Sequence, residues 1–196
     1  RIATPDRHRI RIQWGHYLLA DMMTRRYRTL ICGVNAEDNS HGIISALGEM
    51  LPTSQWDNES ITNYAKGYSE ISPDKVLVLK YDMDDVNVFA LLRPKNRDAY
   101  TLEDISVGFT KIAEMIENRW DRMPCASVSF LGAKSNRLVG DDGIEPSFES
   151  LLRTAHDAGY RGDIYPSVRM WELAPTGVFA TYPFPDSLKI MRSGGY

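Results

Sequence analysis

The order of apolar segments predicts an α/β (α+β) fold in which helices pack on one mixed β-sheet. Short apolar runs of strand character alternate with longer segments of helical periodicity. Two of the runs, KVLVLKY and VNVFALL, are separated only by a short acidic turn, which is typical of a β-hairpin. Strands separated by helices become parallel neighbours, whereas a hairpin makes an antiparallel pair. The order helix, β, α, β-hairpin, α, β, α, β therefore predicts a mixed sheet with a βαββαβ core and a central antiparallel hairpin.

The individual elements follow from local pattern. Apolar residues at three- and four-residue spacing predict a first helix within residues 6–26. Ser40 is a suitable N-cap for one later helix, and Thr101 with Asp104 resembles a capping box at the start of another. In chain order we expect a strand over 27–34, helices over 41–51 and around 61–68, the hairpin over 75–92, a helix over 101–120, a strand over 125–133, a helix over 145–160 and a strand over 165–173.

These elements predict one domain over residues 1–196. Its core spans 26–172, preceded by the N-terminal helix over 1–25 and followed by an irregular tail over 173–196 with at most one further edge strand. The chain begins at Arg1, not at methionine, so we expect it to be one domain of a longer protein. The inner faces of its elements should be buried; these are Phe109, Ile112, Ile116, Val128, Phe130, Leu152 and Ala155.

Composition excludes several classes of protein. The formal net charge of −3 argues against a nucleic-acid binder, which usually carries a strongly basic face. No run of 18 apolar residues and no signal segment is present, so no membrane insertion by this segment and a cytoplasmic location are expected. Cys32 and Cys125 lie in apolar strand-like runs and form no metal-binding spacing, which favours buried structural thiols.

Several local strings resemble the GGDEF domain, the palm-like fold of diguanylate cyclases. The similarity is distributed over residues 4–172, and the LLRTAHDAGY segment is most similar to the family's corresponding helix. The acidic hairpin turn DMDDV lies where the family carries glycine-glycine-aspartate-glutamate-phenylalanine. The matching segments are TPDRHR at 4–9, the strand at 27–34, NSHG at 39–42, DMDDV at 82–86, VSFLGA at 128–133 and LLRTAHDAGY at 151–160.

The departures from this family indicate a degenerate member. Asp82 and Met83 occupy the positions of the two glycines that admit phosphate in the family, and the family's first-strand metal aspartate has no counterpart at 32–34. The lysine that closes the last helix is absent after Tyr160, and the inhibitory arginine-x-x-aspartate site is missing from 72–76. The resemblance therefore implies a domain that forms no cyclic di-GMP.

Carboxylates at the hairpin tip and beyond the first strand are the candidate metal ligands. Asp84 and Asp85 would bind Mg²⁺, and would be the catalytic residues, if the domain were active. Asp38 or Glu37 could replace the missing strand carboxylate, although carboxylates before a helix also favour its positive N-terminus.

The candidate ligand-binding residues are Asn39, His41 and Asp82. Asn39 and His41 belong to the string that resembles the family's helix, and His41 at the helix start could contact an anion. The alternatives are a surface histidine and, for Asp82, a solvated turn.

The leading hypothesis is a non-catalytic GGDEF-like regulatory or interaction domain of a signalling protein, with nucleotide sensing left open. The first alternative is a divergent metal-dependent nucleotidyl cyclase, and the second is an unrelated α/β module that binds a ligand or a protein. No cofactor is expected, with Mg²⁺ reserved for the cyclase alternative. The expected partners are other domains of the same protein or a signalling partner, with a nucleotide and a homodimer left open.

Overall fold

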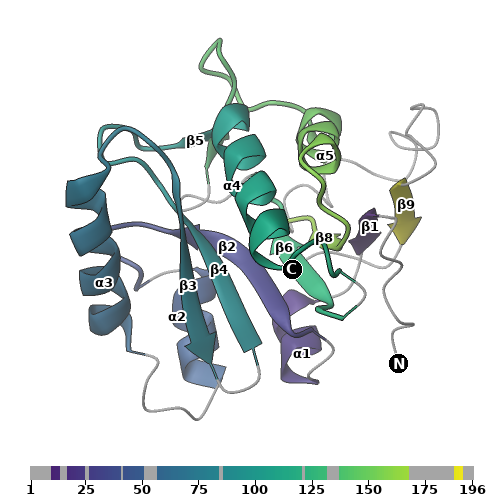
Figure 1. The fold of residues 1–196 in the computed structure, drawn as a ribbon, viewed down its shortest axis with the longest axis horizontal. Helices are drawn as coiled ribbons and strands as arrows, with labels where there is room; N and C mark the ends of the chain where they lie inside the picture. Colours follow the sequence, from purple (N-terminus) through teal and green to yellow (C-terminus); the bar gives the residue numbers. More distant parts are fainter. Residues whose placement is uncertain are drawn as a thin grey trace.

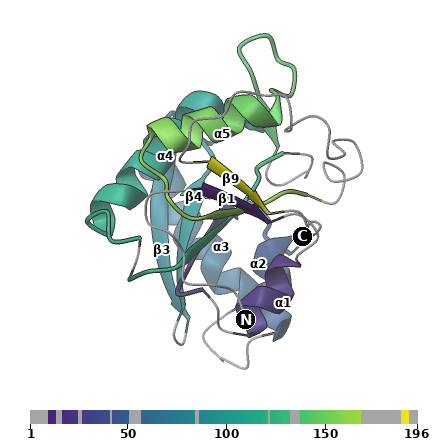
Figure 2. The ribbon, with the colours of Figure 1, turned by 90° about the vertical axis from the view of Figure 1, so that its right-hand side faces the viewer.

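The computed structural model describes residues 10–13, 17–24, 27–40, 42–50, 57–83, 86–120, 122–131, 137–167 and 188–191. A seven-stranded sheet lies between two layers of helices (Figures 1 and 2). Its strand order is β3-β4-β2-β6-β8-β1-β9, and β3 and β4 form its antiparallel pair whereas the other neighbouring strands run parallel. No helix in these ranges has the length and apolar character needed to cross a membrane.

The strands of this sheet are short, and the residues of β1, β2, β4, β6 and β8 are mostly buried. The strands are β1 (Ile10–Gln13), β2 (Thr29–Val34), β3 (Leu77–Met83), β4 (Val86–Leu92), β6 (Cys125–Val128), β8 (Asp163–Tyr165) and β9 (Leu188–Met191). A second, two-stranded sheet pairs β5 (Tyr100–Thr101) with β7 (Leu138–Val139).

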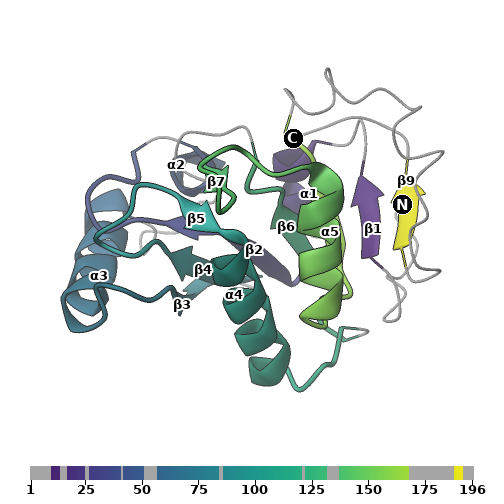
Figure 3. The same ribbon diagram turned by 90° about the horizontal axis from the view of Figure 1, so that it is seen from above.

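The helices divide between the two faces of the sheet. One face carries α1 (Leu18–Met23), α2 (Ile43–Met50) and α3 (Asn58–Ile71), and the other carries α4 (Leu102–Met115) and α5 (Phe148–Asp157) (Figures 2 and 3). Helix α4 begins at the predicted capping box: the Thr101 hydroxyl accepts from Asp104 N, and the Asp104 carboxylate accepts from Thr101 N. The helix lies so close to β4 that a Cβ at Gly108 would be 2.6 Å from a methyl of Leu91.

The predicted core is confirmed. Phe109, Ile112, Ile116, Val128, Phe130, Leu152 and Ala155 are all buried. Cys32 and Cys125 are buried free thiols, and burial raises the pKa of Cys32 to about 12, so its thiol is neutral. The helical and strand periodicities therefore identify the residues that fill the space between sheet and helices.

A buried ion pair joins two neighbouring strands on the α1 side of the molecule. The guanidinium of Arg11 in β1 binds both carboxylate oxygens of Asp163 in β8, at 2.8 and 3.0 Å, and the residues are 5% and 1% exposed. Gln13 donates to the same carboxylate at 2.9 Å, and Tyr27 donates to it at 2.6 Å. The carboxylate is therefore held by donors from β1 and from the residues that precede β2.

Two tyrosines extend this network to α1. The hydroxyls of Tyr27 and Tyr165 are 2.5 Å apart, and Tyr165 donates to Asp21 of α1. Burial, and the carboxylate of Asp163, raise the pKa of Tyr27 above its ordinary value, so the phenol stays protonated. The network thus connects α1, β1, β8 and the start of β2.

The N-terminal helix predicted over 1–25 is wrong. Residues 10–13 form strand β1 inside the sheet, and the helix α1 is limited to Leu18–Met23. The backbone of residues 10–13 is extended because β1 pairs with β8 on one side and with β9 on the other. Strand β9 lies at the edge of the sheet and is the one further edge strand that the prediction allowed in the irregular tail. Residues 173–187 and 192–196 lie outside the described residues.

The predicted hairpin is confirmed, but its central position is wrong. β3 and β4 pair antiparallel from Leu77↔Leu92 to Met83↔Val86, and β3 is the edge strand of the sheet. A palm-like core with a central hairpin is therefore not what these elements form. The sequence defines a hairpin through its turn, but a turn contains no information on which strand pairs with the other side of β4.

We expect Ile112→Ala to destabilise the fold by about 2–5 kcal/mol, because it leaves a cavity under α4. Ile112 is fully buried. The free energy of unfolding would be measured by urea denaturation. Val107→Ala is the matched control on the same helix, since that side chain is 47% exposed. A similar loss for both variants would contradict the burial of this helix face.

We expect Asp163→Ala to destabilise the fold by about 3–5 kcal/mol, because the buried guanidinium of Arg11 loses its counter-charge. The double variant Arg11→Met with Asp163→Leu removes both charges and should lose less stability than Asp163→Ala alone. Urea denaturation of both variants tests this. A double variant that is at least as unstable as Asp163→Ala would show that the charge pair is not the source of the loss.

Candidate functional site

The carboxyl ends of β2, β4 and β6 form the candidate site. The chain leaves β2 toward α2 on one face of the sheet, whereas it leaves β4 toward α4 and β6 toward α5 on the other face. Connections that depart to opposite faces open a crevice between them, and ligands of open α/β sheets bind in such crevices. The fold thus directs attention to the residues that directly follow these strands.

Two asparagines shape the loop after β2. The Asn35 Oδ1 accepts from the backbone N–H groups of Glu37 and Asp38, at 3.0 and 2.8 Å. The Asn39 side chain accepts from Asn35 N at 3.1 Å and donates to Asn35 O at 2.8 Å and to Thr62 of α3 at 3.0 Å. The loop is therefore fixed before any ligand binds.

The segment after β4 is tied to the end of β2. The backbone N–H of Arg93 donates to Val34 O at 3.2 Å. The buried hydroxyl of Tyr100 lies 2.6 Å from Leu91 O and 3.2 Å from Val34 O, so it bridges the two strand ends. Burial raises the pKa of Tyr100 above its ordinary value, so the phenol keeps the proton that it donates.

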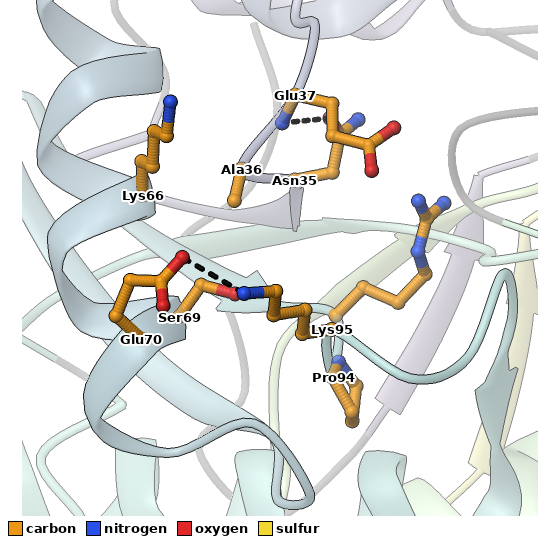
Figure 4. A pocket seen from close by; sticks show the side chains of 9 residues that line it. Asn35, Ala36, Glu37, Lys66, Ser69, Glu70, Pro94 and Lys95 are labelled. Carbon is orange, nitrogen blue, oxygen red and sulfur yellow. Dashed lines mark hydrogen bonds and ion pairs between the residues drawn. The ribbon is translucent and has the colours of Figure 1, made fainter.

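A cavity of about 260 Å³ lies between these two segments and helix α3 (Figure 4). Its polar lining consists of Asn35, Glu37, Lys66, Ser69, Glu70, Arg93 and Lys95. Lys95 and Glu70 form an ion pair of 2.8 Å across the cavity wall, and this contact holds the pKa of Glu70 below its usual range. The cavity contains three cations and two carboxylates, so it favours an anionic ligand.

A second opening of about 500 Å³ adjoins the first. The two share Glu37, Arg93 and Lys95, and the second also includes Arg97. The guanidinium of Arg97 already binds Asp104 at 2.9 Å, near the start of α4. Arg93 lines both openings, so its charge lies within reach of a ligand in either one.

The turn after β6 has an unusual backbone. Phe130 adopts a φ of 56°, in the left-handed region that a bulky side chain rarely occupies. Its buried ring packs edge-to-face on Tyr100 and Phe109, with centroids 5.4 and 6.3 Å apart. Conformations of this kind cost about 1–3 kcal/mol and cluster at functional sites. The turn faces the same end of the sheet as the loops after β2 and β4.

The structure separates the acidic residues that the sequence analysis singled out. Asp38 follows the carboxyl end of β2, whereas Asp82 pairs with Asn87 at the amino end of β4, beside Lys80 at 3.5 Å. Asp38 and Asp82 thus lie at opposite ends of the sheet. Asn39 lies beside the cavity, where its side chain braces the loop. Asp84, Asp85 and His41 lie outside the described residues, and the described part of the chain contains no cluster of three metal-ligating side chains.

Sequence reasoning missed the basic residues of the cavity. Arg93 and Lys95 directly follow a predicted strand, and that position was the available signal. Lys66 and Glu70 could not have been placed beside them, because they come from α3 and approach the site only through packing.

Comparison with solved structures gives the fold. The macrodomain of Thermus aquaticus DarG superposes with a TM-score of 0.50 at 11% sequence identity, over 80% of this chain and 96% of that chain. The macrodomain of Mycobacterium tuberculosis DarG gives a TM-score of 0.49 at 15% identity, over 79% of this chain and 95% of that chain. No protein-family model and no curated protein sequence matches this sequence. The first comparison shows a macrodomain-like α/β fold, and at this identity it shows the fold alone.

The resemblance to the GGDEF domain is therefore wrong. The interpretations that depended on it, a degenerate signalling domain linked to cyclic di-GMP and a divergent cyclase, are wrong with it. The similar strings reproduced the order β, α, hairpin, α, β along the chain, but order alone does not determine which strands pair. Among the hypotheses drawn from the sequence, an α/β ligand-binding module agrees best with the fold.

Proposed function

We propose that this chain binds ADP-ribose, either free or attached to another molecule. The macrodomain fold is an ADP-ribose-binding fold. The observation that carries the proposal is the cationic cavity of this chain at the carboxyl ends of β2 and β4. The ligand class of the macrodomain fold and the positive charge of the cavity are separate observations, and both support the binding of ADP-ribose.

The lining residues match the two chemical parts of such a ligand. A guanidinium such as that of Arg93 binds phosphate oxygens in a bidentate manner, and Lys66 and Lys95 add point charges. The Oδ1 of Asn35 is occupied by the loop backbone, which leaves its Nδ2 to donate to a ribose hydroxyl. Glu37 supplies a carboxylate that accepts from a second hydroxyl.

We also propose a second function, hydrolysis of the bond between ADP-ribose and an attached group. Its basis is that Glu37, Arg93 and Lys95 line both openings, so a ligand that spans them places its connecting bond beside an acid and a base. Glu37 takes a proton from water, whose oxygen bonds to the anomeric carbon. The bond from that carbon to the leaving oxygen breaks with its electron pair on that oxygen, which Lys95 protonates.

We expect isothermal titration calorimetry to detect binding of ADP-ribose, and Arg93→Ala to weaken it about tenfold or more, because a hydrogen bond to a charged group contributes about 1.5–3 kcal/mol. Lys111→Ala is the control, since this exposed lysine lies on α4, outside the cavity lining. Absence of ADP-ribose binding by the unmodified chain, or equal binding by Arg93→Ala, would refute the proposed site.

We expect the unmodified chain to release p-nitrophenol from p-nitrophenyl ADP-ribose. Glu37→Gln should slow the release about 100-fold or more, the usual contribution of a general base, whereas Lys95→Ala should slow it less, because p-nitrophenolate is a stable anion that leaves without protonation. Absorbance of the released phenolate measures the rate, again with Lys111→Ala as control. If the chain binds ADP-ribose but releases no phenol, the hydrolytic proposal is refuted and the binding proposal stands.

A further inference from the structure

The outer edge of β3 has backbone groups available for pairing. Among the described strands β3 has β4 as its neighbour and lies at the end of the sheet. The N–H of Asn87 in β4 donates to Arg28 O, toward β2 and away from β3. Asn87 is opposite Asp82, so these two form a non-hydrogen-bonded pair and the N–H and C=O of Asp82 point outward. By the alternation of an antiparallel ladder, Val78 and Lys80 also point these groups outward.

The charged side chains on this edge are self-complementary, because opposite charges can meet when two copies of β3 pair antiparallel. Lys80 and Asp82 lie on the same face of β3 and are 44% and 73% exposed. If a second β3 pairs antiparallel about Tyr81, Lys80 of each copy lies opposite Asp82 of the other. Lys80 and Asp82 both point their backbone N–H and C=O groups away from β4, as this pairing requires. A register centred on Lys80 would instead place the two lysines opposite each other, which is destabilising.

Helix α3 presents apolar side chains along the same edge. Tyr64, Tyr68 and Ile71 are 43%, 40% and 78% exposed, at the spacing of one helix stripe. The ring of Tyr64 packs on Tyr68 and on Tyr81 of β3, with centroids 5.0 and 5.3 Å apart. A two-fold axis through an antiparallel β3 pair is perpendicular to the sheet, so both copies of α3 lie on the same face. Their exposed stripes then approach each other across the axis.

We propose that a second copy of this chain docks on β3 and extends the sheet by antiparallel β3–β3 pairing centred on Tyr81. An edge that is protected only by like charges would repel a second copy, whereas this edge carries one charge of each sign at positions that meet. The ion pair between Lys80 and Asp82 within one chain is exposed, so its exchange for the intermolecular pair costs little. None of the residues named for this surface lines the ligand cavity.

Analytical ultracentrifugation of the full chain over a concentration series tests the proposal. We expect the unmodified protein to approach twice its monomer mass of 22.2 kDa. Lys80→Asp places four carboxylates at the axis and Asp82→Lys places four ammonium groups there. Each variant alone should therefore have a dimer dissociation constant raised about tenfold or more.

An equimolar mixture of the two variants provides the decisive measurement. In the heterodimer both aspartates of the Lys80→Asp chain face lysines of the Asp82→Lys chain, so mixing should restore the lower dissociation constant that each variant alone loses. Lys111→Asp, which makes the same charge change on the exposed surface of α4, should dimerise like the unmodified chain. A monomeric unmodified chain, a dimer that persists in both single variants, or a mixture that stays monomeric would each overturn the proposal.

Discussion

The guanidinium of Arg11 is buried, and a buried charge is stable only where a counter-charge and hydrogen-bond partners surround it. Asp163, on the neighbouring strand, supplies the counter-charge and accepts two hydrogen bonds from the guanidinium. Gln13 and Tyr27 donate further hydrogen bonds to the same carboxylate. A shift of β1 by one residue would turn Arg11 to the opposite face and leave Asp163 unpaired. The register of β1 against β8 is thus fixed by charge, and β9 pairs with β1 in its turn.

The parallel arrangement that results determines where a ligand can bind. β2, β4 and β6 end at the same edge of the sheet, so the loops that follow them meet there. Tyr100 bridges the ends of β2 and β4 through its hydroxyl, and its ring packs on Phe130, whose strained backbone begins the loop after β6. One buried aromatic pair therefore connects all three loops, and the cationic cavity opens beside it.

The local sequence pattern predicted the elements that nearby residues define, such as the apolar stripe of α4 and the β3–β4 hairpin. β1 was missed because the three- and four-residue spacing of apolar residues over 6–26 favoured a helix over the short alternation Ile-Arg-Ile-Gln, and Arg11 reads as exposed unless its partner is known. That partner is 152 positions away. The same limit applies to the cavity: Arg93 and Lys95 follow a predicted strand, but their opposing residue Glu70 belongs to a helix that reaches them only through tertiary packing.

Helix α3 takes part in both proposed surfaces because its side chains point in different directions. Lys66 and Glu70 point toward the cavity, where Glu70 binds Lys95 (Figure 4). Tyr64 and Tyr68, on another side of the helix, pack toward β3. The face between them, which includes Ala65, is buried and keeps the helix in place. A helix fixed in this way presents its charges to a ligand at one end of the sheet and its aromatic rings to the sheet edge, so a contact on either side would restrain the same rigid element.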